Sequence, residues 1–521
     1  MPLVGYRIGI DVGGTNTDAV ILDEQDRVIA QVKTATTEDV ATGIETALSR
    51  VLASARIDRR QIRHAMLGTT QCTNAIVERQ RLSRIAVLRI GAPATLAVEP
   101  LAGIPEDLKQ AMIHYVEIVR GGHEFDGREI APLDTEAIRA FAQSVKNRVD
   151  AAAVTSVFAP VSPDHEERAA AIFRDVLGAD FPVSLSYRIG SIGLIERENA
   201  TILNAALTGV ARRTVQGFEA ALAGQGVNAL AFFGQNDGTL MSAEYAMQYP
   251  IRMIACGPTN SLRGASYLTG LENAVVVDVG GTTTDIGVIA NGFPRESAVA
   301  VEIGGVRTNF RMPDLVSVGI GGGTVIHLKP GGGFSVGPES VGYRLTEKAL
   351  VFGGDTLTFT DVAVGLGKVA IGDSTRTASL DKELLMAIYR DIIARIEEAV
   401  DRVKVSGDAV PVVLTGGGSA LFPDVLAGAS QIIRPAHFNV ANAIGAAIAQ
   451  VSGEIERVYS LEKTARTAAV EDAKRRAVAV AVEAGASPET CHVVDIEDVP
   501  LAYLPGNATR IKVKAAGDLV G

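Results

Sequence analysis

One octad is written twice in the chain, as Asp11-Val12-Gly13-Gly14-Thr15-Asn16-Thr17-Asp18 and as Asp278-Val279-Gly280-Gly281-Thr282-Thr283-Thr284-Asp285. The two copies, DVGGTNTD and DVGGTTTD, differ at a single position. Apolar runs rich in β-branched residues flank each copy, which predicts a strand, a tight Gly-Gly turn and a second strand. One copy alone would be compatible with an ordinary β-hairpin. Two near-identical copies indicate a repeated functional unit.

The Gly-Gly turns are predicted to bind phosphate. Two glycines let the backbone approach a ligand closely and turn several N–H groups towards it, and the threonines add hydroxyl donors. Asp11 and Asp278 end the first strand of each hairpin and offer a carboxylate to a hydrated Mg²⁺. Two such hairpins that face each other would hold a polyphosphate from both sides. The predicted phosphate contacts are Gly13, Gly14, Thr15, Asn16, Thr17, Gly280, Gly281, Thr282 and Thr283.

A second polar segment, Gly68-Thr69-Thr70-Gln71-Cys72-Thr73-Asn74, follows a short predicted strand and opens a helix. A helix N-terminus carries partial positive charge and free N–H groups, so it favours an anion or a polarised carbonyl. Thr70 and Asn74 are therefore candidates for contacting a substrate. The alternative is that these threonines only cap the helix, and the sequence leaves both interpretations open.

Three consecutive glycines, Gly416, Gly417 and Gly418, follow a predicted strand over residues 410–415. A backbone without side chains permits flat contact with an adenine and its ribose, so we expect this segment to line the adenosine site. A plain strand-to-helix turn, the alternative, would need only one glycine.

Strands and helices alternate between residues 62 and 177, which predicts an α/β lobe. Each half of the chain begins with an octad and ends with an Ala-rich helix, at 196–210 and 440–447, so we predict an internal duplication. We also expect these two helices to cross with their backbones close together. A long Ala/Val-rich helix and two strands predict a small C-terminal α+β region. The expected boundaries are 1–198 for the first lobe, 199–455 for the second and 456–521 for the C-terminal region.

The composition restricts the class of protein. A chain of 521 residues implies two or three domains, and a net charge of −11 argues against a nucleic-acid or anionic-membrane surface. The three cysteines lie far apart, which fits a reducing compartment and excludes a disulfide framework. The seven histidines form no HxxH or HxH pair, so we expect ordinary structural roles for them. We therefore expect a cytoplasmic protein with neither nucleic acid nor membrane as a partner.

The order of hairpin, helix, hairpin, triglycine and helix resembles the actin/sugar-kinase/Hsp70 ATPase superfamily (the ASKHA fold). This resemblance implies an α/β fold of two duplicated actin/ribonuclease-H-like lobes with an ATP cleft between them, plus a small C-terminal α+β appendage. The similarity narrows to the ATP-dependent hydantoinase/5-oxoprolinase family, A-subunit type. The motifs that carry it are RIGIDVGGTNTD (7–18), GTTQCTNAIVER (68–79), NATILNAAL (199–207), VVDVGGTTTDIGVI (276–289), GIGGGTVI (319–326) and VGPESVGYRLT (336–346).

The family resemblance implies that ATP phosphorylates the carbonyl oxygen of a hydantoin, 5-oxoproline or another lactam before the ring is opened. Such phosphoryl transfer needs mainly positioning and charge neutralisation. It also implies ATP and Mg²⁺ as cofactors, a possible B-type second subunit and an oligomer. Two alternatives stay open: the ATP-binding subunit of a related acetone/acetophenone-type carboxylase, and a regulatory ATPase. Stimulation of ATP turnover by a substrate would separate the cyclic-amide hydrolase and the carboxylase from a regulatory ATPase.

Overall fold

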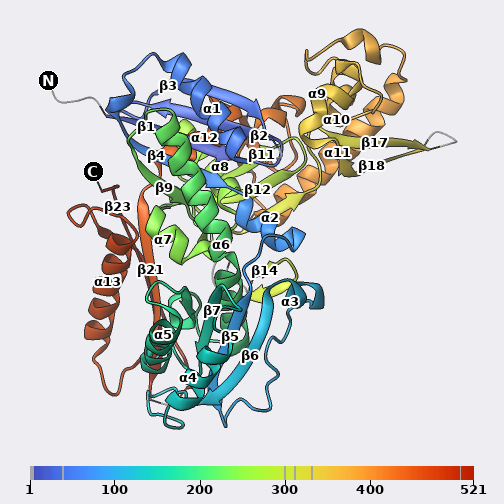
Figure 1. Cartoon of the computed structure of the whole chain (residues 1–521). Coiled ribbons are helices and arrows are strands. Elements are labelled where there is room, and N and C mark those ends of the chain that lie inside the picture. Colours follow the sequence, from blue (N-terminus) through green and yellow to red (C-terminus); the bar gives the residue numbers. More distant parts are fainter. Residues whose placement is uncertain are drawn as a thin grey trace.

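Two β-sheets, each containing one octad, organise the molecule (Figure 1). The structure is a computed structural model that describes residues 5–37, 40–297, 301–309, 312–329, 333–404, 406–504 and 506–520. The first sheet consists of β1 Tyr6–Val12, β2 Asn16–Leu22, β3 Val28–Ala35, β4 Ile62–Thr69, β9 Leu230–Gly234, β10 Leu240–Ser242, β21 Val451–Ser460, β22 His492–Pro500 and β23 Ala508–Gly517. The second consists of β11 Ala274–Val279, β12 Thr284–Ala290, β13 Phe293–Pro294, β16 Leu315–Val318, β19 Val410–Thr415 and β20 Ala429–Ile433.

The strand order is β22-β23-β21-β10-β9-β4-β1-β2-β3 in the first sheet and β13-β12-β11-β19-β20 in the second, where β16 also pairs with β12. In both sheets the octad forms an antiparallel hairpin, with Asp11 opposite Asp18 and Asp278 opposite Asp285. In both, a parallel strand joins the first strand of the hairpin, β4 beside β1 and β19 beside β11. A further parallel strand follows each, β9 beside β4 and β20 beside β19. The predicted duplication is therefore confirmed.

The helices cover these sheets and join them. They are α1 Val40–Ala55, α2 Gln71–Glu78, α3 Glu106–Met112, α4 Thr135–Ser144, α5 Asp164–Leu177, α6 Leu194–Gly224, α7 Ala243–Gln248, α8 Cys256–Thr269, α9 Leu345–Lys348, α10 Phe359–Gly365, α11 Lys382–Val403, α12 Ala441–Ile448 and α13 Arg466–Glu483. The first sheet packs against α1 and α6, where Ile10, Leu48 and Phe218 are fully buried. The second packs against α11, whose Ile388, Ile392 and Ile396 repeat at four-residue spacing and face the sheet.

The C-terminal residues form the expected α+β region, and their strands continue the first sheet through the pairing of β23 with β21. Helix α13 buries Ala469, Ala473, Ala477 and Ala481, which share one face because they are four residues apart. The backbone can approach closely there: a Cβ on Gly453 would lie 2.1 Å from the Ala481 nitrogen. The division at 198/199 and 455/456 stays a prediction, and the first sheet takes strands from all three of those segments.

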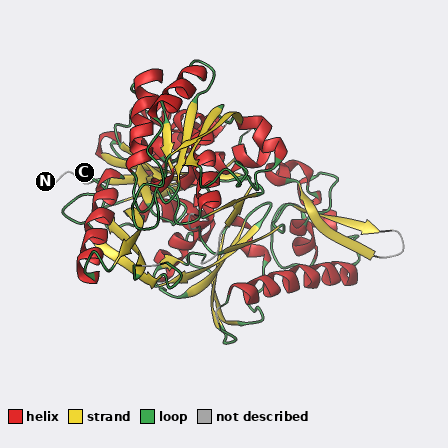
Figure 2. Cartoon of the chain, turned by 90° about the horizontal axis from the view of Figure 1, so that it is seen from below, coloured by secondary structure: helices red, strands yellow, loops and turns green. Residues whose placement is uncertain are grey.

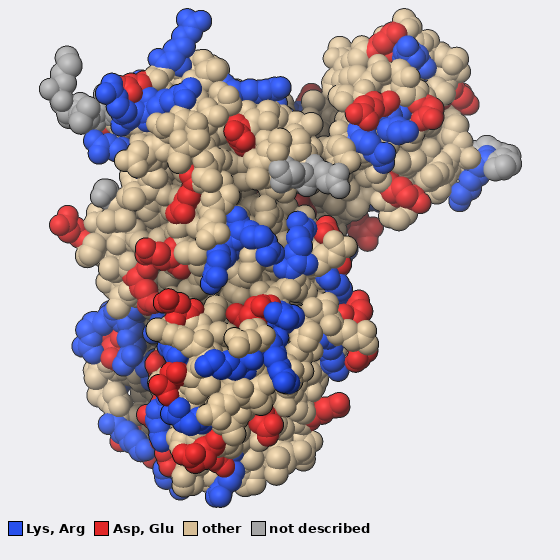
Figure 3. All heavy atoms as spheres, in the orientation of Figure 1, with Lys and Arg blue, Asp and Glu red and all other residues tan. Residues whose placement is uncertain are grey.

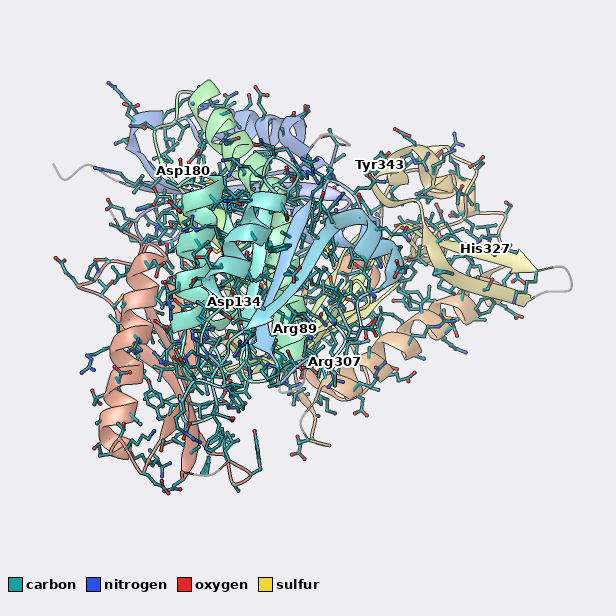
Figure 4. The ribbon with its side chains drawn as sticks, turned by 60° about the horizontal axis from the view of Figure 1, so that its bottom comes forward. Arg89, Asp134, Asp180, Arg307, His327 and Tyr343 are labelled. Carbon is teal, nitrogen blue, oxygen red and sulfur yellow. The ribbon has the colours of Figure 1, made fainter. Side chains whose placement is uncertain are left out.

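A smaller parallel sheet in the order β6-β5-β7-β8 lies at the opposite end of the molecule from the octads (Figure 1). Its strands are β5 Ile85–Ala92, β6 Ile113–Arg120, β7 Ala151–Ser156 and β8 Val183–Leu185, and they alternate with helices as the sequence predicts. Arg89 on β5, labelled in Figure 4, lies fully buried and donates to both carboxylate oxygens of Glu198 on α6, at 2.7 and 2.5 Å. Removal of one partner of such a buried pair typically costs about 3–5 kcal/mol, so this pair ties the small sheet to α6.

The close helix crossing is formed by α8 and α12, so the predicted crossing of α12 with the Ala-rich part of α6 is wrong. A Cβ on Gly445 would lie 1.8 Å from the Asn260 carbonyl oxygen, and one on Gly264 would lie 1.9 Å from that of Ala441. Glycine is required at both positions because the two backbones touch. Helix α12 also packs on β1, where a Cβ on Gly9 would lie 2.2 Å from the Ala443 carbonyl oxygen.

Two hairpins form small sheets of their own, β14 Val301–Ile303 with β15 Val306–Thr308, and β17 Thr324–Lys329 with β18 Gly333–Ser340. The second projects from the body of the molecule, as the view in Figure 2 shows. Basic and acidic side chains are interspersed over the face drawn in Figure 3. Within the described residues, no helix combines the length and apolar character needed to cross a membrane.

Candidate active site

The turns of the two octads meet. The hydroxyl oxygens of Thr15 and Thr282 are 3.4 Å apart, and a Cβ on Gly281 would lie 2.6 Å from the Thr15 side chain. Both turns close with the same hydrogen bond, from the Gly13 N–H to Asn16 O at 3.0 Å and from the Gly280 N–H to Thr283 O at 2.9 Å.

The turn residues differ in what they can offer a ligand. The Gly13 and Gly280 N–H groups are used within their turns, whereas Gly14 is exposed and a Cβ there would meet nothing within 4 Å. Thr17 is fully buried, with its hydroxyl 3.3 Å from that of Thr36. Thr282 and Thr283 are exposed. The phosphate-binding role of the nine predicted turn residues stays a prediction. Among them, the structure favours Gly14, Thr15, Gly281 and Thr282, where the two turns meet.

Asp11 is held by two amide groups at the centre of the site. Asn260 Nδ2 on α8 donates to one carboxylate oxygen at 3.0 Å, and Asn442 Nδ2 on α12 donates to the other at 2.9 Å. Gly68 on β4 leaves the space for this carboxylate, since a Cβ there would lie 2.2 Å from its Oδ1. Burial raises the pKa of Asp11 to about 6, partly opposed by the Asn260 hydrogen bond and reinforced by the nearby Asp18.

Asp278 receives hydroxyl groups instead of amides. Ser261 Oγ donates to it at 2.6 Å and Thr415 Oγ1 at 3.3 Å, and burial raises its pKa. Because Asn260 and Ser261 are consecutive on α8, this helix bridges the two octad carboxylates. The arrangement supplies oxygen ligands of the kind that a hydrated Mg²⁺ accepts.

Lys33 is a site residue that the sequence reasoning missed. Its Nζ lies 2.6 and 2.7 Å from the carboxylate oxygens of Asp18 and donates to Asn439 O at 3.0 Å. Its Cε would lie 3.4 Å from a Cβ on Gly417, and its charge opposes the rise in the pKa of Asp278. The signal was the cross-strand pairing of Asp18 with Lys33, which is visible only once the register of β2 and β3 is known.

The triglycine packs against the second octad. Gly416 has a φ of 80°, and a Cβ there would lie 2.4 Å from Val279 O and 2.5 Å from Asp278 Oδ1. A Cβ on Gly418 would lie 2.6 Å from the Val279 side chain. Both glycines are therefore required by packing, whereas Gly417 is exposed. Gly417 is the position at which the adenosine prediction can be tested.

The segment around Thr70 lies beside Asp11, because β4 pairs with β1 so that Gly68 stands opposite Asp11. The Thr70 side chain makes no capping hydrogen bond to α2, and Asn74 Nδ2 donates to its hydroxyl at 3.5 Å. Thr69 is buried and accepts from the Gln71 N–H at 3.3 Å. Thr69 therefore supplies the oxygen that caps this helix end. The substrate role of Thr70 and Asn74 stays a prediction.

Two other reactive groups have structural roles. Near the site, the Cys256 thiol at the start of α8 donates to Thr69 O at 3.3 Å, and burial raises its pKa to about 12, so it is no nucleophile. Far from it, beside the small sheet, His123, Glu129 and His165 lie close enough for metal ligation. However, the Gly122 N–H donates to His165 Nδ1 at 2.9 Å, so the proton lies on Nε2, which donates to Glu129 at 3.1 Å. A metal-bound histidine would need the opposite arrangement.

Most of the chain matches two family descriptions, "Hydantoinase/oxoprolinase N-terminal region" over residues 7–177 and "Hydantoinase/oxoprolinase" over residues 197–405. An uncharacterised protein of Methanocaldococcus jannaschii is 27% identical over 77% of this chain and 62% of its own length. The caprolactamase alpha subunit of Pseudomonas jessenii is 28% identical over 70% and 55%. The acetophenone carboxylase gamma subunit of Aromatoleum aromaticum is 28% identical over 70% and 53%. The alignments thus span little more than half the length of these relatives.

Solved structures share the fold. The ATP-dependent caprolactamase of Pseudomonas jessenii superposes with a TM-score of 0.78 at 20% identity, covering 99% of this chain and 88% of that one. Nucleotide-free acetone carboxylase superposes with a TM-score of 0.70 at 18% identity and the same coverage. The two-lobed α/β architecture that the sequence predicts is therefore confirmed.

Proposed function

Because this chain belongs to the hydantoinase/oxoprolinase family, we propose that it is the ATP-binding, activating part of an ATP-dependent hydrolase of cyclic amides. The substrate class is a hydantoin, 5-oxoproline or another lactam. The observation that carries the proposal is the meeting of the two octad turns, with their leading aspartates bridged by consecutive residues of α8.

The proposed reaction begins with attack of the amide carbonyl oxygen on the γ-phosphorus of ATP. An oxygen–phosphorus bond forms, the bond from the γ-phosphorus to the β–γ bridging oxygen breaks, and ADP leaves. The activated carbon then accepts a water, and the ring nitrogen takes up a proton as its bond to that carbon breaks, which leaves an acyl phosphate. A second water attacks the same carbon, and the bond from this carbon to the phosphate-bearing oxygen breaks, so phosphate leaves with the former carbonyl oxygen. Overall, the cyclic amide, ATP and two waters give the ring-opened acid, ADP and phosphate. The chain's task is the first step, which needs positioning and compensation of charge.

Each part of the site has a distinct task in this proposal. Gly14, Thr15, Gly281 and Thr282 hold the phosphates from opposite sides, and Gly417 faces the nucleoside. Thr70 and Asn74 hold the carbonyl oxygen, which becomes more negative during attack. Asp11 and Asp278 would hold Mg²⁺, which would supply positive charge to neutralise the phosphates.

The donor set fits a divalent cation. Asp11, Asp18, Asp278 and Asp285 all have pKa values raised by burial. In the part of the chain that the structure describes, Asp18 is the member of this group with a lysine or arginine at ion-pair distance. Buried carboxylates without a cation are costly, so a bound Mg²⁺ would compensate the remaining charge.

A second candidate is supported by the acetophenone carboxylase relative, which is as similar to this chain as the caprolactamase subunit. The same site would then phosphorylate the enol oxygen of a ketone. In either case we propose a second subunit that completes the reaction, since both relatives are named as subunits.

The test is ADP formation by the purified chain with a panel of hydantoins, 5-oxoproline, lactams and ketones. We expect at least one cyclic amide to stimulate ADP formation, and the Asp11→Asn variant to lose that stimulation. Stimulation by ketones alone would select the carboxylase. An ADP rate that no compound changes would reject both and leave a regulatory ATPase.

A further inference from the structure

A cavity of about 300 Å³ lies away from the octads, and none of the octad residues lines it. Its walls come from segments far apart in the chain: the loop after β7, the turn after β8, the turn between β9 and β10, the 3₁₀ turn Pro250–Met253, strand β21 and helix α13. The cavity thus lies where the small parallel sheet meets strand β21 of the first sheet and α13, a boundary of the kind at which ligand sites occur.

Two donor side chains of this cavity have no protein partner in the part of the chain that the structure describes. Among the described residues, none lies at hydrogen-bond or ion-pair distance from the Arg252 guanidinium, and the same holds for the hydroxyl of Tyr245. Arg457 donates to Val161 O at 3.3 Å and has donors to spare. Burial, and then the nearby Arg476, lowers the pKa of Arg457, whereas Asp472, which pairs with Arg476 at 2.7 Å, acts in the opposite direction.

Most acidic groups of the cavity have a lysine or arginine partner. Lys514 on β23 lies 2.8 Å from Asp237 and 3.2 Å from Glu296. Lys512 lies 2.8 Å from Glu296 and 2.9 Å from Glu454.

Of the two remaining acids, Glu483 pairs with Arg188 at 3.1 Å, whereas Glu456 lies 4.0 Å from Arg510 and its Oε1 has no hydrogen-bond partner among the described residues. The lining therefore keeps two acceptors, Glu456 Oε1 and Asn309 Oδ1, beside the donors of Arg252, Arg457 and Tyr245.

Most of the remaining lining is apolar or aromatic, with Ser191, Asn236 and Asn309 as its other polar residues. The rings of Tyr245 and Tyr249 lie 4.5 Å apart, and Ile251, Ile455 and Val480 complete the apolar surface. An apolar lining with a few unsatisfied donors is typical of a site for a small organic molecule, in which the polar groups fix its orientation.

We infer that this cavity binds a small organic carboxylate, whose oxygens accept from Arg252, Arg457 or Tyr245 and whose apolar body lies against Tyr249, Ile455 and Val480. Arginine suits this task because its planar donors match the two oxygens of a carboxylate. The inference does not depend on the proposed reaction, since it uses no residue of the octads and requires no nucleotide.

The test is isothermal titration calorimetry of the whole chain without nucleotide, with benzoate and with benzylamine as a cation of matched shape. We expect benzoate to bind at least about tenfold more tightly than benzylamine, since a charge-assisted hydrogen bond to a carboxylate is worth about that factor. Arg252→Met should weaken benzoate binding by a similar factor. Arg212→Met, at an exposed arginine of α6 that does not line the cavity, should leave it unchanged.

A second pair of variants tests the location of the ligand independently of the charge of the arginines. Ala479 lines the cavity from an accessible position on α13, so Ala479→Phe should fill it and abolish binding with the fold intact. Ala468→Phe adds the same ring at an exposed position of α13 outside the lining and should have no effect.

Three results would overturn the inference: no benzoate binding to the unaltered chain, equal binding of benzylamine, or full binding by the Ala479→Phe variant. Competition with ATP for benzoate, which would place the ligand at the octads, would overturn it as well.

Discussion

The two octads share their sequence, turn hydrogen bond and strand pairing, yet their aspartates meet different surroundings. In the first hairpin, Asp11 receives two amide groups and Asp18 pairs with Lys33. In the second, Asp278 and Asp285 receive hydroxyl groups, from Ser261 and Thr415 and from Ser317 respectively. The repeat therefore specifies the backbone twice, whereas the neighbouring elements decide where fixed positive charge lies. The first lobe carries its own cation beside Asp18, whereas neither aspartate of the second octad has a lysine or arginine at ion-pair distance among the described residues.

The lobes also differ in the segment that comes after the parallel strand beside each hairpin. After β4 come Thr69 and Thr70 and then α2, which supply hydroxyl and amide groups. After β19 come Gly416, Gly417 and Gly418, which present bare backbone. This difference suggests a division of tasks, with the substrate carbonyl on the first lobe and the nucleoside on the second.

The two octad turns are also held by hydrogen bonds from different segments of the chain. Thr36 donates to the carbonyl oxygens of Gly13 and Thr15, so a residue directly after β3 supports the first turn. The second is supported by Gly322 and Gly323, whose N–H groups donate to Gly280 and Gly281 at 3.0 and 2.7 Å. The second turn thus depends on a segment about 40 residues further along the chain (counted from these residue numbers).

The largest expected effect tests whether the octads are equally necessary. Asp11→Asn and Asp278→Asn should each lower ATP turnover by about 10³-fold or more, because each would remove a charge from the proposed metal site, while nucleotide binding persists. ADP release measures ATP turnover, and equilibrium binding of a labelled nucleotide measures nucleotide affinity. Asp180→Asn, at an exposed aspartate far from the octads, is the control. Full activity in the double variant would refute the metal assignment.

The next effect tests the substrate role of the first lobe. Thr70→Ala or Asn74→Ala should lower substrate-stimulated turnover by about 10²–10³-fold, the usual cost of a lost donor in a preorganised site. A capping role alone predicts a loss of about 1 kcal/mol in the free energy of unfolding and unchanged turnover. Melting temperature and stimulated turnover, measured on the same two proteins, decide between these outcomes.

A smaller effect distinguishes the two lobes directly. Lys33→Met should lower ATP turnover by about tenfold to a hundredfold, because Asp18 is left buried without its cation, whereas Ser317→Ala at the equivalent place in the second lobe should cost less than about tenfold. Lys33→Arg should recover part of the loss, since the charge is kept. Equal losses at Lys33 and Ser317 would mean that the asymmetry has no functional consequence.

The smallest effect concerns the nucleoside. Gly417→Val should weaken ATP binding by about tenfold and leave the melting temperature nearly unchanged, because Gly417 is exposed. Gly418→Val should lower the melting temperature instead, since a Cβ there meets Val279 at 2.6 Å. Normal ATP affinity in the Gly417→Val protein would show that the triglycine is only a turn.

Much of this organisation was readable from the sequence because its signals are local. Each octad lies between β-branched runs that specify two strands and a turn, and repetition of the octad indicated the two lobes. The alternation of strands and helices between residues 62 and 177 was likewise visible as a change of period.

The features that escaped prediction depend on contacts between distant segments. The crossing of α8 with α12 requires Gly264 and Gly445 to meet, and neither position has a local pattern that names its partner. Lys33 became visible only through the register of β2 and β3. The extension of the first sheet by β9, β10, β21 and β23 joins three parts of the chain, and strand pairing between them has no signature in sequence order.

The most direct test of the central claim, that the two lobes transfer the γ-phosphoryl group of ATP to a carbonyl oxygen, uses a cyclic amide labelled with ¹⁸O at that carbonyl. The measurement is the mass of the phosphate released during turnover of a compound that stimulates ADP formation. We predict phosphate carrying one ¹⁸O atom, because the carbonyl oxygen becomes bonded to phosphorus and leaves with it. Phosphate without label, alongside an amino acid that retains the ¹⁸O, would contradict the claim.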